Sequence, residues 1–155
     1  MTDPTPNPPK TPQWDIEWIQ SVLPHRYPLL LVDRVLEIEP KKRIVAIKNV
    51  TVNEPCFNGH FPGRPVMPGV FLVEGMAQAG GLLLLHDIPD RASKLIFFMG
   101  IEGAKFRRPV VPGDQVRYEV EVLRLRSMHC KMSGKVFVDG HLAAEAVISS
   151  AMVDR

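Results

Sequence analysis

One imidazole and one carboxyl group in this sequence stand where they could transfer protons. His60 lies in the segment GHFPGRPVMPGV, residues 59–70, where three prolines follow the histidine within eight positions and restrict its backbone. A histidine titrates near neutral pH, so His60 is the natural candidate for a general base. Glu74 carries the only formal charge of the apolar run 66–85, where an ionised carboxylate is costly to bury. We therefore expect Glu74 to be held partly protonated unless it finds a partner, which would suit a general acid.

An apolar helix predicted over residues 68–86 supplies the other groups. Gly69 and Val70 fall in its first turn, where backbone N–H groups lack intrahelical partners and can hold a developing oxyanion. Gln78 lies four residues after Glu74 and shares its helix face. These groups suit removal of a proton next to a thioester or similar carbonyl, with loss of a beta-hydroxyl as water. Hydrolysis of a thioester could use the same groups, and the residues alone do not choose between the two reactions.

Length and composition describe one ordinary globular domain. The chain has 155 residues, of which 45% are apolar and 23% charged, and it has no internal repeat. A net charge of +2 without a basic-aromatic repeat argues against a nucleic-acid partner. Cys56 and Cys130 have no metal-ligand spacing, and the scattered histidines give none either. We therefore expect two free thiols, no metal and a cytoplasmic location.

No segment predicts a signal peptide or a membrane span. Residues 1–13 hold five of the fifteen prolines and no apolar core, so we expect a disordered tail there and a single domain over residues 14–155. The run 66–85 is apolar enough to be considered as a span. Its four glycines and its central Glu74 and Gln78 argue instead for a helix buried in a globular core.

The remaining chain has mostly strand-like patterns. Asp15 can cap a short helix over residues 16–23, which Pro24 ends. One long apolar helix among consecutive antiparallel strands predicts an α+β fold, in which a curled sheet of about six strands wraps the helix. Such a sheet leaves an open edge, so we expect a homodimer. The predicted strands are 29–39, 44–52, 94–101, 115–126, 128–138 and 141–153, with a bulge near Leu123 and a two-residue turn at Asp139-Gly140.

Several motifs resemble those of one family. They are LPHRYP at residues 23–28, LVDR at 31–34, the segment at 59–70, Glu74 followed by MAQ at 76–78, and KFRRPVVPGDQ at 105–115. Over residues 15–153 the chain is similar to the 3-hydroxyacyl-[acyl-carrier-protein] dehydratases of the FabZ type. That resemblance implies a hot-dog fold and dehydration of (3R)-3-hydroxyacyl-acyl carrier protein to the trans-2-enoyl thioester in fatty-acid synthesis. It also implies a supply of hydroxymyristoyl chains where lipid A is made, and we expect no dissociable cofactor.

The resemblance also suggests roles for particular residues. His60 matches the family's catalytic histidine and Glu74 its catalytic glutamate, and the family builds each site from the histidine of one chain and the glutamate of the other. It commonly assembles three dimers into a hexamer. The related dehydratase–isomerases carry aspartate at the position of Glu74, so glutamate here favours dehydration alone. Two positions depart from the usual family pattern, because Cys56 replaces an aromatic residue and Gly75 replaces an alanine.

Other residues have roles that the sequence leaves open. Phe97 and Phe98 lie where the family often has aromatic residues at the mouth of the acyl tunnel, with core packing as the alternative. His25 belongs to a family motif, in which it could anchor a loop or take part in catalysis. Acyl carrier protein is acidic, so a cluster with net charge +3 in residues 94–108 could dock it, with a solvated face as the alternative. Its cationic members are Lys94, Lys105, Arg107 and Arg108.

Two other functions would use the same fold. A hot-dog thioesterase would release free thiol from an acyl thioester. A regulatory domain would bind the thioester without turnover. The preferred acyl length depends on side-chain packing that no residue pattern reveals.

Overall fold

The computed structural model describes residues 14–155, and the predicted tail at 1–13 lies outside the described residues. The helices are α1 (Ile16–Val22) and α2 (Gly69–Leu85), with short 3-10 turns η1 (Pro55–Asn58) and η2 (Arg91–Ser93). The strands are β1 (Arg34–Glu39), β2 (Arg43–Asn49), β3 (Lys94–Phe106), β4 (Gln115–Arg126), β5 (His129–Val138) and β6 (His141–Asp154). These are the two helices and six strands that the sequence predicts. The bounds differ most at the start of β1 and at the ends of β2 and β3, since β2 stops at Asn49 and not at position 52.

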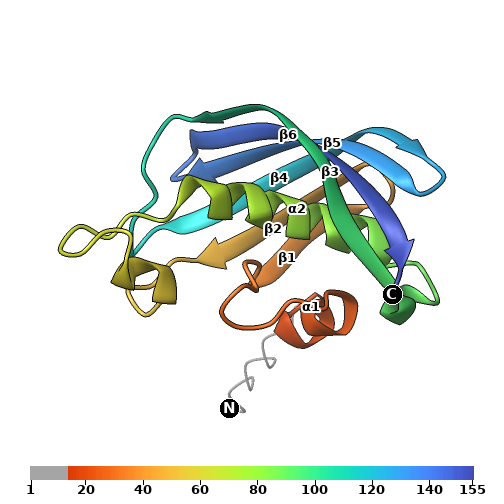
Figure 1. Cartoon of the computed structure of the whole chain (residues 1–155), viewed down its shortest axis with the longest axis horizontal. Helices are drawn as coiled ribbons and strands as arrows, with labels where there is room; N and C mark the ends of the chain where they lie inside the picture. The colour runs from red at the N-terminus through yellow and green to blue at the C-terminus, as the bar shows by residue number, and fades with distance from the viewer. Residues whose placement is uncertain (1–13) are drawn as a thin grey trace, which may run out of the picture.

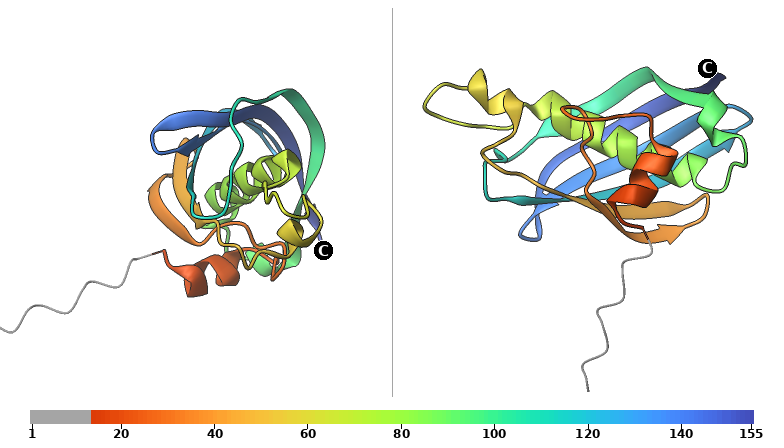
Figure 2. Two further views of the ribbon diagram at one scale, coloured as in Figure 1. Left: turned by 90° about the vertical axis from the view of Figure 1, so that its left-hand side faces the viewer. Right: turned by 90° about the horizontal axis from the view of Figure 1, so that it is seen from below.

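A single antiparallel sheet curls around α2. The strand order is β1-β2-β4-β5-β6-β3, and every neighbouring pair is antiparallel. The sheet wraps one side of α2, while α1 and the loop that follows it lie on the opposite side (Figures 1 and 2). Strands β1 and β3 form the two edges. The predicted arrangement, a long central helix inside a curled six-stranded sheet, is therefore confirmed.

Helix α2 is buried over most of its surface. Pro68 occupies its N-cap position, and Pro89 follows its C-terminal end. Eleven of its 17 residues are buried, including a run of six from Gln78 to Leu83. Its buried residues belong to the hydrophobic core, and burial of apolar surface stabilises the fold by roughly 25 cal/mol per Å². The helix therefore forms the centre of that core. Among the described residues, no helix is long and apolar enough to cross a membrane.

The local strand signals are confirmed in detail. Val116, Tyr118 and Val120 of β4 are fully buried and alternate with charged, more exposed neighbours. The register shifts between Val122 and Arg124, which is the predicted bulge. Asp139 and Gly140 both have positive φ, 49° and 76°, as a type I′ hairpin turn between β5 and β6 requires.

The segment before β1 is where the strand prediction was wrong. Residues 29–33 were predicted as strand, but β1 begins only at Arg34. The amide of Leu31 donates to Gln78 Oε1 at 2.8 Å, and Gln78 Nε2 donates to the carbonyl of Leu29 at 2.7 Å. A side chain of α2 thus takes the backbone hydrogen bonds that a neighbouring strand would otherwise supply. The segment lies along the helix and leaves the sheet.

Strand β3 extends beyond its predicted end and stays exposed. It pairs with β6 from Lys94 as far as Phe106, with register shifts at Phe98–Gly100 and Glu102–Lys105. As an edge strand it has no neighbour on its other side within the described chain. Its exposed side chains include several large apolar ones: Phe97, Phe98, Met99, Ile101 and Phe106. A long apolar edge of this kind is a template for pairing with another chain.

Gly75 is explained by the packing of one aromatic residue. A Cβ atom at this position would lie 2.2 Å from the hydroxyl oxygen of Tyr118. Tyr118 is fully buried, and its hydroxyl has no hydrogen-bond partner among the described residues. The glycine therefore makes room for a large side chain of the sheet beneath α2. This close approach accounts for the departure from alanine that the sequence shows at this position.

Candidate active site

The predicted site residues lie in two separate hollows of the chain. The first, called here the His60 hollow, is lined by His60, Val66, Met67, Gly69, Val70, Leu72, Phe106, Arg107, Arg108, Pro109 and Val110. The second, called the Glu74 hollow, is lined by Leu23, Pro24, His25, Glu74, Ala77, Gln78, Gly81, Leu85, Ser150 and residues 94–98. The structure therefore groups His60 with Gly69 and Val70, and Glu74 with Gln78, Phe97 and Phe98.

The loop around His60 fixes the ring by backbone contacts. The amide of His60 donates to the carbonyl of Cys56 at 3.0 Å, and its own carbonyl accepts from the amide of Val66 at 3.0 Å. The ring atom Nδ1 lies 2.6 Å from the carbonyl oxygen of Val66. A carbonyl can only accept, so we assign the proton to Nδ1, which leaves the lone pair of the neutral ring on Nε2. His60 is thus held in the tautomer that a general base needs.

The start of α2 opens into the same hollow as His60. Pro68 has no side-chain group that caps the helix. No hydrogen bond uses the amides of Gly69 and Val70 within the described residues, so both remain available as donors. Val70 is 68% exposed. These amides and the positive end of the helix dipole could hold an oxygen that gains negative charge during a reaction.

Phe106 adds a residue that the sequence did not single out. A Cβ atom at Gly69 would lie 2.8 Å from two carbon atoms of the Phe106 ring. The glycine therefore makes room for an aromatic ring over the start of the helix. Phe106 belongs to the motif at residues 105–115, but only the extension of β3 brings its ring to Gly69. Its position within a basic motif gave no signal for this contact.

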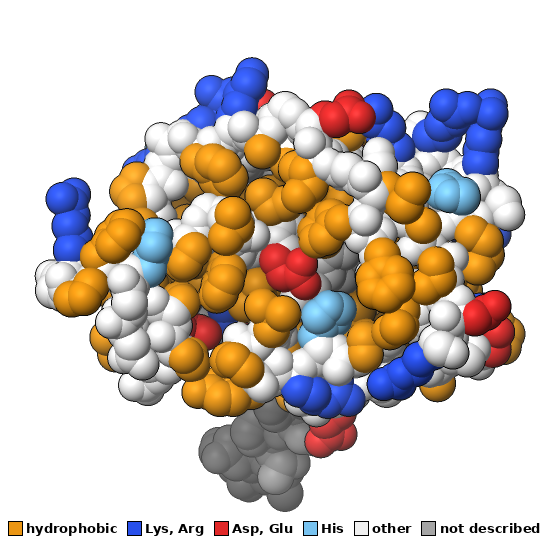
Figure 3. All heavy atoms as spheres, in the orientation of Figure 1, with side chains coloured by type: hydrophobic (Ala, Val, Ile, Leu, Met, Phe, Trp, Pro, Cys, Tyr) orange, Lys and Arg blue, Asp and Glu red, His pale blue; other side chains and the backbone are white. Residues whose placement is uncertain are grey.

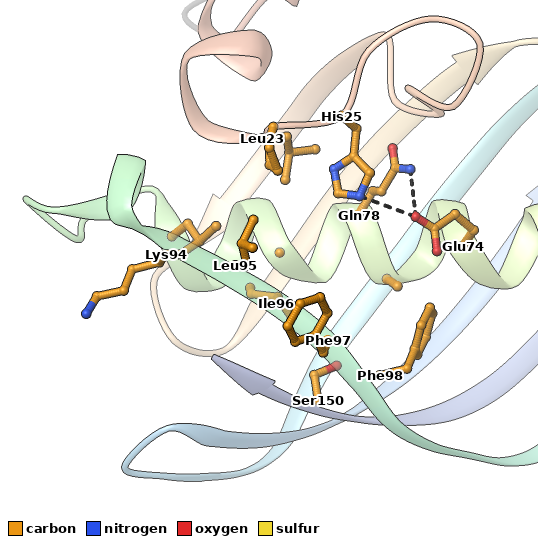
Figure 4. Close-up of a pocket in the computed structure, with 14 residues that line it drawn as sticks. Leu23, His25, Glu74, Gln78, Lys94, Leu95, Ile96, Phe97, Phe98 and Ser150 are labelled. Carbon is orange, nitrogen blue, oxygen red and sulfur yellow. Dashed lines mark hydrogen bonds and ion pairs between the residues drawn. The ribbon is translucent and has the colours of Figure 1, made fainter. Parts of the chain in front are cut away.

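Glu74 projects into the second hollow and finds partners there. Its Oε1 accepts from Gln78 Nε2 at 3.0 Å and lies 3.4 Å from His25 Nε2 (Figure 4). In the space-filling view an acidic side chain and a histidine adjoin in the middle of a largely apolar face (Figure 3). The structure thus brings His25 to Glu74, a contact between the loop after α1 and the middle of α2.

Gln78, which the sequence places among the groups around the reaction, mainly supports the fold. It is only 2% exposed, and both hydrogens of its Nε2 are used, one toward Leu29 and one toward Glu74. Its Oε1 accepts from Leu31 and keeps one lone pair free. Gln78 lines the Glu74 hollow, but its amide mainly ties the loop before β1 to the helix. Its expected contact with substrate is limited to that lone pair.

Phe97 and Phe98 form a wall of the Glu74 hollow. They come from β3, on the side of the hollow opposite His25, and remain 56% and 42% exposed (Figure 4). The cavity beside them measures about 220 Å³ and is mainly apolar in its lining. An apolar cavity of about 150 Å³ accepts benzene, so this space suits an apolar chain of several carbons. The partial exposure of both rings excludes simple core packing within one copy of the chain.

The predicted basic cluster is divided by the length of β3. Lys105 ends this strand, and Arg107 and Arg108 follow it and line the His60 hollow. Lys94 begins the strand, at most about 36 Å away along the chain at roughly 3.3 Å per residue, and pairs with Asp90 and Asp154. The prediction of one cluster was therefore wrong for Lys94. Arg107 is partly neutralised by Glu145 at 3.3 Å, and the ion pairs of the described chain leave Lys105 and Arg108 free.

The electrostatic setting of His25 differs from that of an ordinary surface histidine. Burial lowers the pKa of its imidazole, an effect that the Glu74 carboxylate opposes and Arg26 reinforces. The buried Nδ1 atom of His25 has no partner among the described residues.

In residues 14–155 no group of three or more His, Cys, Asp or Glu side chains could hold a metal ion.

Comparisons with known proteins point to one family. The family model of the FabA-like domain matches residues 23–147. The chain is 61% identical over 141 residues to the 3-hydroxyacyl-[acyl-carrier-protein] dehydratase FabZ of Koribacter versatilis, a match that covers 91% of this chain and 90% of the relative. It is 55% identical over 143 residues to the FabZ of Bordetella pertussis, with 89% and 95% covered.

Solved structures agree with this assignment at the level of the fold. The dehydratase heterocomplex ApeI:P from Xenorhabdus doucetiae superposes with a TM-score of 0.77 at 18% identity, covering 88% of this chain and 91% of that one. A hot-dog-like protein from Thermanaerovibrio acidaminovorans gives a TM-score of 0.61 at 20% identity, with 76% and 84% covered. Together with the order of the sequence motifs, these similarities show that the chain belongs to the FabZ family of 3-hydroxyacyl-[acyl-carrier-protein] dehydratases, with the hot-dog fold.

Proposed function

We propose that this protein dehydrates (3R)-3-hydroxyacyl-acyl carrier protein to the trans-2-enoyl thioester in fatty-acid synthesis, in sites that two copies of the chain share. The observation that carries the proposal is the division of the site residues. One hollow holds a base and free helix amides, and the other holds a carboxyl group beside an apolar cavity. Neither hollow alone has the groups for the reaction. Each supplies what the other lacks.

The reaction assigns one task to each hollow. Nε2 of His60 removes a proton from the carbon next to the thioester carbonyl. The amides of Gly69 and Val70 hold the oxygen as it becomes enolate-like. The carboxyl group of Glu74 gives its proton to the beta-hydroxyl, which leaves as water while the carbon–carbon double bond forms. His60 ends protonated and Glu74 ionised, and proton exchange with solvent restores both.

The exposed edge of β3 supports the pairing of two copies. The two hollows lie at opposite ends of this strand, since Phe106 lines one and Phe97 and Phe98 line the other. If β3 pairs antiparallel with its copy about a two-fold axis near Ile101, the Phe97 end of one copy meets the Phe106 end of the other. Such pairing would join each His60 hollow to the Glu74 hollow of the second copy. It would also cover the apolar side chains that gather on this face (Figure 3).

Two further parts of the proposal concern assembly and partner. For the whole assembly we propose the trimer of dimers that the resemblance implies, which sedimentation would measure. For acyl carrier protein we propose a docking site on Lys105, Arg107 and Arg108, beside the opening where a phosphopantetheine arm would enter the His60 hollow. Cys56 and Cys130 are both free, as in proteins of a reducing compartment, which supports a cytoplasmic location. A supply of hydroxyacyl chains for lipid A stays an expectation from the resemblance.

Co-expression of two inactive variants tests the shared site. A hybrid dimer of His60→Ala and Glu74→Gln chains has one intact site, made from the His60 of one chain and the Glu74 of the other. With random pairing we expect about a quarter of the wild-type activity per site, because half of the dimers are hybrids and half of their sites are intact. Two different His60 variants co-expressed are the control and should stay inactive. No recovery in the mixture would contradict the shared site.

Analysis of the products that the wild-type protein forms separates dehydration from the two alternatives, thioester hydrolysis and thioester binding without turnover. Enoyl thioester formed from hydroxyacyl carrier protein, without release of free thiol, is the expected result. Free thiol as the main product would indicate a thioesterase. Tight binding of the thioester without either product would indicate a regulatory domain.

A further inference from the structure

His25 makes the contact in the Glu74 hollow that the proposed reaction leaves unused. It lies in the loop between α1 and β1, and its Nε2 is 3.4 Å from Glu74 Oε1. Arg26 holds this loop by donating to the carbonyl oxygens of Gln20, Leu23 and His25. The imidazole is therefore presented to α2 by an anchored backbone, with its Nε2 edge toward the carboxyl group (Figure 4).

The surroundings of the ring favour its neutral form with the proton on Nε2. The charged groups that face it are Glu74 and Arg26. A protonated ring would carry a buried N–H at Nδ1 without an acceptor, which is costly, whereas a neutral ring leaves only a bare nitrogen there. The lowered pKa of His25, which burial causes, agrees with this form. Neutral His25 then has a single N–H, on the ring atom that lies 3.4 Å from Glu74 Oε1.

Two donors thus converge on one oxygen of the carboxyl group. Gln78 Nε2 donates to Oε1 at 3.0 Å, and His25 Nε2 approaches the same atom at 3.4 Å. Within the described chain no hydrogen bond or ion pair reaches Oε2. In a protonated carboxyl group one oxygen carries the hydrogen and the other accepts. An Oε1 that faces two donors must be the acceptor, so the proton belongs on Oε2.

We propose that His25 is a positioning residue, which with Gln78 holds Glu74 Oε1 and so keeps the transferable proton on Oε2, turned toward the substrate hydroxyl. The inference rests on the proposed function, because it assumes that Glu74 is the acid. Neutrality of His25 is essential to this role. A protonated imidazole at this distance would stabilise the carboxylate, the form that cannot donate a proton.

Substitutions at position 25 separate positioning from structural support. His25→Leu removes the donor, and we expect kcat to fall about 10- to 100-fold with KM changed less than about threefold, since a misdirected group costs rate more than binding. His25→Gln places an amide nitrogen near the position of Nε2 and should recover most of kcat. His25→Asn is polar but too short to reach Glu74, so it should resemble His25→Leu. His86→Leu, at the other end of α2, is the control and should leave kcat unchanged.

A double substitution tests whether His25 acts through Glu74. In a Glu74→Gln background, where no acidic proton remains, His25→Leu should lower the residual rate less than twofold. Thermal unfolding and the oligomeric state of each variant are measured in parallel. Equal kcat values for wild type and His25→Leu, no rescue by His25→Gln, or a full additional loss in the Glu74→Gln background would each overturn the inference. Near-normal turnover of Glu74→Gln itself would instead contradict the proposed function.

Discussion

The two hollows are built in different ways. The His60 hollow depends on a stiff loop and on the free amides of a helix start, so the carbonyl that fixes its base and the donors for an oxyanion come from the backbone. The Glu74 hollow depends on side chains from α2, β3 and the loop after α1. A backbone-built half can be rigid within one chain because its geometry is set locally. The side-chain-built half needs distant segments to be packed correctly before its carboxyl group points the right way.

Their charges differ as well. Arg107 and Arg108 lie at the His60 hollow, whereas the lining of the Glu74 hollow is mainly apolar, and its one cation, Lys94, is paired with two aspartates. An anionic carrier and its arm would therefore approach from the His60 side, and an acyl tail would be accepted on the Glu74 side. The two halves should therefore respond to substitution in distinct ways.

The largest effect is expected from removing the reacting group of either half. His60→Ala and Glu74→Gln should each lower kcat about 10²- to 10⁴-fold, the usual contribution of general acid–base catalysis. Both side chains end in open hollows, so the oligomer and the unfolding temperature should hardly change. Steady-state kinetics and light scattering measure the two properties. Near-normal turnover of His60→Ala would remove the base from the proposed mechanism.

A smaller effect is expected from the charges around the His60 hollow. Charge reversal of Arg107 and Arg108 should lower kcat/KM for carrier-protein substrates about tenfold or more, with little change for small thioester analogues, because only the acidic carrier senses the charge. Charge reversal of Arg124 and Arg126, two exposed arginines of β4 that line neither hollow, is the matched control and should spare both substrates. Losses of the same size with both substrate types would place the arginines in folding or catalysis and remove them from docking.

The smallest effect concerns the helix that joins the two halves. Gly75→Ala should destabilise the protein by about 1–3 kcal/mol, because the new methyl group overlaps Tyr118 beneath α2. Gly81→Ala meets only ordinary contacts with Leu23 and Ile96 and should stabilise it by about 0.5–1 kcal/mol through helix propensity. Denaturant unfolding of both variants tests the sign. A stabilised Gly75→Ala protein would mean that Tyr118 moves freely, and that α2 is less rigidly seated than the contact implies.

Local features of the chain were readable from sequence. The bulge after Val122, the turn at Asp139-Gly140 and the apolar central helix each depend on neighbouring residues, and the structure has all three. The predicted pair of His60 and Glu74 also came from local settings, a Pro-rich loop and a charge in an apolar run. Their meeting across two copies stays a prediction.

Sequence by itself determined which residues could react and which elements would carry them, because propensity, turns and periodicity act over a few positions. Tertiary structure alone decided that Leu29–Leu31 leaves the sheet, since Gln78, almost fifty residues later, takes its hydrogen bonds. It also decided that Lys94 and Lys105 stand far apart and that His25 reaches Glu74. These outcomes depend on contacts between distant parts of the chain, which no local pattern encodes.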